Sequence, residues 1–297
     1  MTGGWNGRRP AGRVAYIDGR YVRHGEAAVH IEDRGLQLGD SVYEVCRIAD
    51  GRLLDREEHL DRLERSLREI QMAMPTTRAA LKFVMGETVR KNGARDGLLY
   101  LQVTRGALRR DHPIALPAPK PTLILTVHPL NPAAIERRRA EGVAVVTCPD
   151  ERWARCDIKS TQLLANLLAK TAAKRAGAFE AWLVDADGFV TEGASTTAWI
   201  VDDKGAIVTR EISHAILPGV TRLVLLEAAR AEQMPVVERR FTLQEAHSAR
   251  EAFLTSASAA AVPVVSIDGK PVGDGRPGPL TRRFIALYAS RSCKTVA

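Results

Sequence analysis

Hydrophobic and polar residues alternate along several short segments of the chain, and this two-residue period predicts half-buried β-strands. Residues 14–22 follow the pattern around an Asp-Gly pair, which is a strong signal for a hairpin turn. Residues 41–48 alternate in the same way before a second Asp-Gly pair at 50–51. The start of the chain therefore predicts two successive β-hairpins.

A helical period follows these hairpins. Apolar side chains recur three or four residues apart, at Leu60, Leu63, Leu67 and Ile70. This stripe predicts an amphipathic helix over about 56–73, and a second helix is expected over 77–92. Strands at 98–104 and 122–128 complete the first unit.

Two prolines within residues 129–134 separate this unit from an arginine-rich helical segment, which favours a domain linker. Beyond the linker we expect strands at 143–147, 181–184, 197–201, 235–237, 252–255 and 262–267, and helices at 161–177, 220–233 and 279–290. We thus expect a flexible tail over 1–11, an N-terminal α/β domain over 12–128, a linker over 129–134 and a C-terminal α/β domain over 135–297. The mixture of hairpins and helices predicts an α+β (mixed α/β) two-domain protein instead of a uniformly parallel sheet.

Composition narrows the class of protein. With 297 residues, of which 45% are hydrophobic, the chain is expected to fold around buried cores. No apolar run approaches the roughly 18 residues that span a bilayer, and the first residues do not resemble a signal peptide, so a cytoplasmic protein without a membrane partner is expected. The four cysteines form no CxxC pair, which argues against a disulfide framework or a metal site.

The net charge of +8 suggests anionic ligands. Nucleic acid is not the expected partner, because the arginines over 56–69 alternate with Glu and Asp as they do on a solvated helix face. Phosphate or carboxylate ligands fit the charge equally well. A non-enzymatic module that binds an anionic partner stays open as a remote alternative.

Lys159 and Glu192 are the first candidates for chemistry. A lysine reacts with an aldehyde only when its amine is partly neutral, and nearby cations such as Arg152 and Arg155 favour the neutral form. A carboxylate that faces a pyridine nitrogen keeps this nitrogen protonated. The pair therefore indicates pyridoxal 5'-phosphate (PLP) chemistry, although a lone lysine is more often a solvated surface residue.

A cofactor phosphate requires donors at a helix start, and residues 216–222 offer them. Pro218 and Gly219 interrupt the chain just before the helix predicted from 220, although an ordinary turn and helix cap would have the same sequence. Arg62 is a second candidate because it lies beside the apolar stripe of the helix at 56–73. The alternative is an arginine on the surface.

Residues 104–113 leave a strand through a glycine into a basic loop that carries Arg110 and His112. Arginine presents a planar fork to a carboxylate, and a histidine and a tyrosine hydroxyl satisfy its remaining lone pairs. Tyr43 is the candidate hydroxyl. The alternatives are a solvated loop and a half-buried strand tyrosine.

Eight segments together resemble a known family. They are Glu-Asp-Arg-Gly (32–35), Gly-Asp-Ser-Val-Tyr-Glu (39–44), Glu-His-Leu-Asp-Arg-Leu (58–63), Thr-Arg-Gly (104–106), Cys-Asp-Ile-Lys-Ser (156–160), Thr-Glu-Gly (191–193), Pro-Gly-Val-Thr-Arg (218–222) and Thr-Ser (255–256). In this order and spacing they are similar to the class IV PLP-dependent aminotransferases, and the resemblance covers nearly all of the chain after the tail. Within that family they are most similar to the bacterial D-amino acid (D-alanine) aminotransferases.

The resemblance implies the two-domain fold of these enzymes and a role for each matching residue. Lys159, in the C-terminal domain, resembles the catalytic lysine that forms a Schiff base with PLP, and Glu192 resembles the partner of the pyridine nitrogen. The other positions that match cofactor-binding residues are Arg62, Ser195, Val220, Thr221 and Ser256.

The same resemblance implies that Arg110 and His112, with Tyr43, bind the α-carboxylate of the substrate. It also implies a homodimer in which their loop crosses to the neighbouring subunit's site. The expected reaction is transamination between a D-amino acid, such as D-alanine, and a 2-oxo acid, either 2-oxoglutarate or pyruvate. A branched-chain L-amino acid transaminase, an (R)-amine transaminase and an aminodeoxychorismate lyase-like enzyme stay open as alternatives, and Arg110 and His112 speak against them.

The chain departs from the family pattern at three positions. Ser41 stands where a glycine is usual, Ala194 replaces a serine, and Ala257 replaces a threonine on the phosphate side. Fewer hydroxyls around the phosphate put cofactor affinity in question. Ser258 and Thr196 are the candidates to compensate.

Overall fold

The computed structural model describes residues 12–114 and 116–294, so the expected tail over 1–11 lies outside the described residues. Contacts divide the chain into two units between Leu130 and Asn131, a point inside the predicted linker. A helix, α4 (Pro132–Glu141), already begins within that linker, because the Asn131 side chain accepts a hydrogen bond from Ala134 N–H and caps it.

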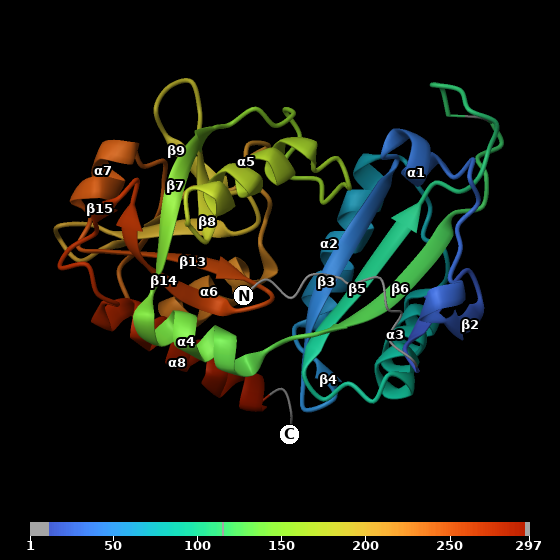
Figure 1. Cartoon of the computed structure of the whole chain (residues 1–297), viewed down its shortest axis with the longest axis horizontal. Helices are drawn as coiled ribbons and strands as arrows, with labels where there is room; N and C mark the ends of the chain where they lie inside the picture. The colour runs from blue at the N-terminus through green and yellow to red at the C-terminus, as the bar shows by residue number, and fades with distance from the viewer. Residues whose placement is uncertain (1–11, 115, 295–297) are drawn as a thin grey trace. The chain divides into compact units, whose positions relative to one another are not determined.

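The first unit contains one antiparallel sheet with the strand order β2-β1-β6-β5-β3-β4 in the described residues (Figure 1). Its strands are β1 (Val14–Ile17), β2 (Arg20–Arg23), β3 (Ser41–Ala49), β4 (Arg52–Leu53), β5 (Gly97–Thr104) and β6 (Thr122–Pro129). Both predicted hairpins are confirmed. Asp18 and Asp50 adopt positive φ angles at the two turns, each followed by a glycine with positive φ.

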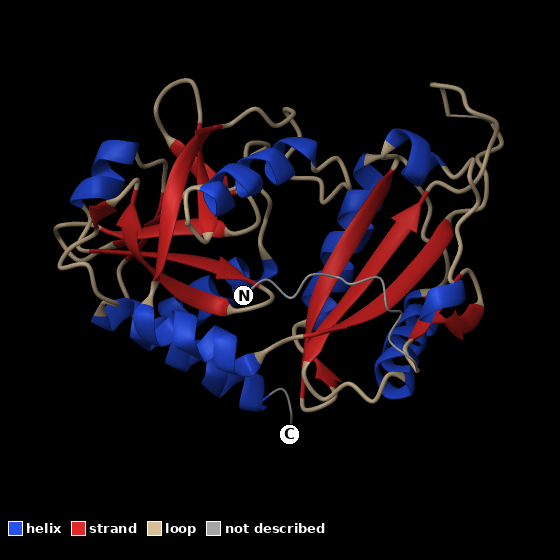
Figure 2. Ribbon diagram, viewed as in Figure 1, coloured by secondary structure: helices blue, strands red, loops and turns tan. Residues whose placement is uncertain are grey.

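Helices α2 (Arg56–Glu69) and α3 (Arg78–Lys91) lie behind this sheet (Figure 2). On β3, alternate residues from Val42 to Ile48 are buried, as the two-residue pattern predicted. Helix α2 ends earlier than the predicted residue 73, because Gln71 adopts a positive φ angle. The sequence did not predict the short helices η1 (His24–Glu26) and α1 (Arg34–Leu38).

The second unit contains a mixed sheet with the order β12-β11-β10-β13-β14-β7-β8-β9, and β15 pairs with β14. Its strands are β7 (Val143–Pro149), β8 (Glu180–Val184), β9 (Val190–Gly193), β10 (Thr197–Val201), β11 (Ile207–Thr209), β12 (Val236–Glu238), β13 (Glu251–Ser256), β14 (Ala260–Ile267) and β15 (Lys270–Pro271). Three pairs, β11–β12, β14–β7 and β7–β8, are parallel, and the others are antiparallel. The predicted mixed α/β fold is confirmed.

The helices of the second unit are α4, α5 (Leu164–Arg175), α6 (Val220–Ala231), α7 (Leu243–Ser248) and α8 (Pro279–Lys294). Helix α5 begins three residues later than predicted. The reason is that Lys159–Thr161 belong to the first unit, where Tyr43 N–H donates to Lys159 O and Thr161 N–H donates to Ser41 O. The expectation that the C-terminal domain carries Lys159 is therefore corrected.

Aromatic rings form the centre of the second unit's core. Phe253 on β13 is fully buried, with its ring centroid 5.3 Å from that of Trp199 on β10 and 5.2 Å from that of Phe284 on α8. Strand β10 is buried along its whole length. These rings fasten α8 to the middle of the sheet.

Replacing Phe253 with alanine should lower the free energy of unfolding by about 3–5 kcal/mol, because it removes a buried ring and leaves a cavity. Phe83→Ala is the matched control, since Phe83 is 68% exposed, and it should change stability by only about 0.5 kcal/mol. Urea unfolding of both variants measures the difference. Equal shifts of the unfolding midpoint would contradict this view of the core.

Candidate active site

Lys159 is held by its backbone against β3 and α2. Its carbonyl accepts from Tyr43 N–H (3.0 Å), and its own N–H donates to Ser66 Oγ (3.3 Å). The side chain is half-buried, and Nζ lies 4.2 Å from the centroid of the Tyr43 ring. The structure thus brings together the predicted catalytic lysine and one predicted substrate residue.

The departure at Ser41 has a local explanation. Ser41 is buried at the start of β3, where its hydroxyl accepts from Gln102 Nε2 (3.1 Å) and bonds with the Thr161 hydroxyl. Gln102 in turn accepts from the Tyr100 hydroxyl, and the Tyr100 ring stacks on Tyr43. Burial, together with the neighbouring Tyr43, raises the pKa of Tyr100 to about 12. A glycine at 41 would remove the middle of this chain of hydrogen bonds.

The expected cationic neighbours of Lys159 are already paired with carboxylates. Arg152 donates to both oxygens of Asp150 and forms an ion pair with Glu192, and Arg155 pairs with Asp157. Each of these two arginines has an anion beside it, and their expected effect on the lysine stays a prediction. Arg152 belongs with the glutamate.

Glu192 lies on β9 and is 5% exposed. Its Oε1 accepts from Arg152 Nη1 and from Leu217 N–H (3.1 Å). Burial raises the pKa of Glu192 above its ordinary value, and the Arg152 guanidinium opposes this shift. The other oxygen, Oε2, has no hydrogen-bond partner in the part of the chain that the structure describes, so it is an acceptor suited to a protonated ring nitrogen. Sequence reasoning missed Arg152 as the partner of Glu192, since 40 positions separate them.

The start of α6 has the features expected of a phosphate site. Gly219 caps the helix without a side chain, and the first helical bond runs from Leu223 N–H to Gly219 O. The N–H groups of Val220 and Thr221 precede this bond and point out of the helix end. A Cβ at Gly219 would lie 3.0 Å from the Thr197 hydroxyl, so the glycine lets the helix start approach β10.

Ser256 lies at the same end of the sheet. Thr197 pairs with Thr255 across β10 and β13, and Ser256 follows directly. The Ser256 hydroxyl bonds with that of Ser258 (3.1 Å), one of the two candidates to compensate for Ala257. The other candidate, Thr196, has a buried hydroxyl without a partner in the described residues. The helix start and the Ser256 hydroxyl each offer donors of the kind that a bound anion requires.

The side chains of Ser195 and Ala194 contact other parts of the second unit. The Ser195 hydroxyl donates to Glu180 Oε2 (2.6 Å), so its predicted role in cofactor binding stays a prediction. Ala194 is buried in an apolar cluster with Ala169, Ala173, Ala181 and Leu183. A serine there would place a hydroxyl among methyl groups, which explains the alanine at this position.

Arg62 faces inward from α2 and is 9% exposed. Its Nε and Nη2 each donate to a different oxygen of Glu44 at 2.8 Å, and His59 Nδ1 lies 2.7 Å from one of these oxygens. Burial by itself raises the pKa of Glu44, but Arg62 and His59 lower it well below its ordinary value. Arg62 is therefore a fixed cation, and its phosphate contact stays a prediction.

Arg110 and His112 lie exposed on the loop after β5. Gly106 begins this loop with a φ angle of 98°, and a Cβ there would overlap the Lys120 carbonyl, so only glycine allows the loop to close. In residues 12–114 and 116–294, neither Arg110 nor His112 forms a hydrogen bond or an ion pair with Tyr43. The structure therefore does not assemble the predicted carboxylate site within one chain.

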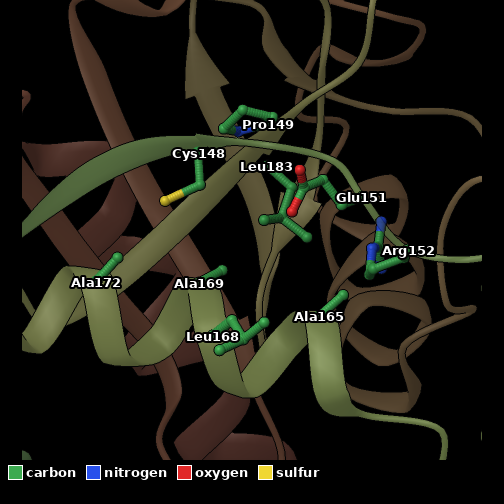
Figure 3. Close-up of a pocket in the computed structure, with 9 residues that line it drawn as sticks. All are labelled: Cys148, Pro149, Glu151, Arg152, Ala165, Leu168, Ala169, Ala172 and Leu183. Atoms are coloured by element: carbon green, nitrogen blue, oxygen red, sulfur yellow. The ribbon is translucent and has the colours of Figure 1, made fainter.

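A pocket in the second unit lies between α5 and strands β7 and β8 (Figure 3). Small apolar side chains such as Ala165, Ala169 and Leu183 line it, and Arg152 lies at its edge. None of the predicted cofactor residues borders this pocket. Within the described residues, no group of His, Cys, Asp and Glu is arranged to hold a metal ion, and no helix is long and apolar enough to cross a membrane.

The family model for amino-transferase class IV matches residues 41–267. The chain belongs to the class IV aminotransferases. The D-alanine aminotransferase of Bacillus licheniformis is 42% identical to it over 90% of this chain and 92% of that protein. The D-alanine aminotransferase of Staphylococcus haemolyticus is 38% identical over 91% of this chain and 94% of its own length.

Solved structures extend the likeness to the fold. The branched-chain aminotransferase of the archaeon Thermoproteus uzoniensis, determined with norvaline, matches with a TM-score of 0.81 at 26% identity and covers 93% of each chain. Another branched-chain amino acid aminotransferase, determined with pyridoxamine 5'-phosphate, matches with a TM-score of 0.85 at 27% identity. That match covers 94% of this chain and 93% of the other. The predicted fold of the class IV enzymes is thereby confirmed.

Replacing Glu44 with glutamine should destabilise the protein by about 3–5 kcal/mol at pH 7, because Arg62 loses its anion while it stays buried. A carboxyl with a lowered pKa stabilises the fold above its unfolded pKa, near 4.3, and this contribution is lost as the pH falls toward the folded pKa. The difference in free energy of unfolding between wild type and Glu44→Gln should therefore decrease below about pH 5, as measured by urea unfolding. The control is Glu57→Gln, which removes a half-exposed ion pair and should cost at most about 1 kcal/mol. A difference in unfolding free energy that does not change with pH would contradict the role of Glu44 as the ionised partner of Arg62.

Proposed function

We propose that this class IV aminotransferase transfers an amino group between a D-amino acid, such as D-alanine, and a 2-oxo acid such as 2-oxoglutarate or pyruvate. One observation carries the choice of substrate. The chain is 42% identical over 90% of its length to a D-alanine aminotransferase, whereas the two branched-chain enzymes of similar fold are 26% and 27% identical. The loop with Arg110 and His112 supports the same choice.

Several residues of this chain fit PLP, each by its own chemistry. Lys159 offers the amine for covalent attachment, and Glu192 offers Oε2 for the protonated pyridine nitrogen. The N–H groups of Val220 and Thr221 and the Ser256 hydroxyl offer donors to the phosphate, with Arg62 as the accompanying cation. When bound, PLP withdraws electrons from the substrate's Cα and so makes its proton acidic.

Lys159 is the proposed base for the proton at the substrate's Cα. With the cofactor bound, Nζ of Lys159 would act as the base that takes this proton from the amino donor. The Tyr43 ring below Nζ restricts where the amine travels, because the two lie 4.2 Å apart. Glu192, which pairs with Arg152, would face the ring nitrogen of the bound cofactor and favour its protonated form.

Arg110, His112 and Tyr43 bind the α-carboxylate in this proposal. A carboxylate held on one side and a base on one face leave a single enantiomer with its Cα hydrogen near Nζ. The D preference would then depend on the loop and not on Lys159 itself.

We further propose a homodimer in which the loop serves the neighbouring subunit. The side chains of Arg110 and His112 are exposed, and within the described residues neither forms a hydrogen bond or ion pair with Tyr43 of its own chain. Large apolar side chains are also exposed, among them Ile31 before α1, Leu36 on α1, and Leu164, Leu167 and Leu168 on α5. Such groups favour burial against another protein surface. A cytoplasmic location is also proposed, and the free thiols of Cys46, Cys148 and Cys156 agree with it.

Replacing Arg110 with alanine should raise KM for D-alanine by roughly 10- to 100-fold, since a charge-assisted hydrogen bond to a carboxylate contributes about 1.5–3 kcal/mol. Borohydride should still fix the cofactor to Lys159, because Arg110 does not hold PLP. The control is Arg109→Ala, an exposed neighbour to which no role is assigned. Steady-state kinetics with 2-oxoglutarate measure the effect, and an unchanged KM would refute the carboxylate role. A protein that takes up no PLP would instead indicate a non-enzymatic anion-binding module.

A further inference from the structure

Arg34 connects helix α1 to the loop at residues 106–113, which follows β5 and carries Arg110 and His112. We call this segment the substrate loop because of the role proposed for these two residues. It is the first residue of α1 and is 4% exposed. Its Nη1 donates to Asp111 O at 2.7 Å, and its Nη2 donates to His112 O at 3.2 Å. A third carbonyl, that of Pro113, lies 3.5 Å from Nη1. One buried guanidinium therefore contacts three consecutive carbonyls of a loop that is otherwise exposed.

Asp40 fixes the guanidinium itself. Its Oδ2 accepts from Arg34 Nε (2.8 Å) and from Arg105 Nε (2.7 Å). Arg105 also donates to the carbonyls of Ile70 and Gln71, which follow the end of α2. Burial alone would raise the pKa of Asp40, but the two arginines lower it below its ordinary value. The anchor is thus a buried cation–anion–cation group that is joined to α2.

The base of the loop is fixed separately. Arg34 N–H donates to Gly106 O (3.0 Å), and Leu108 N–H donates to Glu32 O (3.2 Å). Gly106 lies against the Lys120 carbonyl, where the loop returns. The backbone is therefore fixed at its base by main-chain bonds, whereas beyond Leu108 it is held at 111–113 by the Arg34 side chain.

We propose that Arg34 is a positioning residue for the substrate, which fixes the backbone at 111–113 and thereby orients the side chains of Arg110 and His112 toward the amino acid carboxylate. This inference rests on the proposed role of these two residues. Arg34 touches neither substrate nor cofactor in this account. An arginine is needed because only its planar fork reaches one carboxylate and several carbonyls at once, whereas a lysine presents a single ammonium group.

The test compares wild type with Arg34→Lys, which keeps a positive charge beside Asp40 but loses the fork. We expect KM for D-alanine to rise by about 10- to 100-fold, since small misplacements of binding groups have effects of this size. The kcat at saturating D-alanine and the borohydride labelling of Lys159 should change little. The control is Arg95→Lys, because Arg95 is exposed and its one ion pair within the described residues is with Asp50. If Arg34→Lys does not fold, Arg34→Gln serves instead, since Arg105 still balances Asp40.

A double-mutant cycle separates positioning from a general structural role. If Arg34 acts through Arg110, the substitution at Arg34 should add little to the KM of the Arg110→Ala variant. A further increase in KM of the same size as in the wild-type background would overturn the proposal. An unchanged KM in Arg34→Lys alone would also overturn it.

The order of the loop gives a readout that does not depend on the proposed function. Trypsin cleaves after Arg109 and Arg110, and the rate should rise several-fold in Arg34→Lys because the backbone loses its anchor. Suppose that trypsin cleaves Arg34→Lys faster than wild type, but Arg110→Ala has a normal KM for D-alanine. The anchoring role of Arg34 would then be supported, and the role of Arg110 in carboxylate binding would be refuted. Cleavage at the wild-type rate would show that the anchor fails, whatever the kinetics of Arg110→Ala.

Discussion

The Asp40 carboxylate is shared by two buried arginines, and much of the first unit depends on this arrangement. Through Arg34 it reaches α1 and the substrate loop, and through Arg105 it reaches the end of α2. Removing the anion would leave two guanidinium groups facing each other in a poorly solvated place, which is costly. The loop is therefore an extension of the folded unit and not an independent surface feature.

Carboxylates paired with arginines also occur among the residues proposed to bind the cofactor. Glu44 is kept ionised by Arg62, and Glu192 is opposed by Arg152, each pair with little exposure to solvent. The two carboxylates differ in their pKa. Arg62 and His59 lower the pKa of Glu44, whereas burial raises the pKa of Glu192. Both oxygens of Glu44 are thus occupied by Arg62 and His59. Glu192 binds Arg152 through Oε1, and we propose that its other oxygen faces the protonated ring nitrogen of the cofactor.

Local patterns were predicted from the sequence, whereas long-range pairings were not. The Asp-Gly hairpins and helices α2 and α3 follow from spacing between near neighbours, and the family resemblance follows from the order of short motifs. The contacts of Arg34 with His112 and of Arg152 with Glu192 join positions 78 and 40 residues apart, so no local pattern reveals them. The short helix α1 was missed because five residues are too few to display a period. Ala194 is explained only by the methyl groups that fold around it.

We propose that this class IV aminotransferase selects D-amino acids because the loop holds the substrate carboxylate while Lys159 takes the Cα proton. The most direct measurement compares D-alanine with L-alanine and L-leucine as amino donors to 2-oxoglutarate, by following the amino acid formed. The account predicts a kcat/KM for D-alanine on the order of 100-fold or more above those of both L donors, a ratio that a misplaced Cα hydrogen produces. Equal or faster transfer from L-leucine would contradict it and point to a branched-chain enzyme.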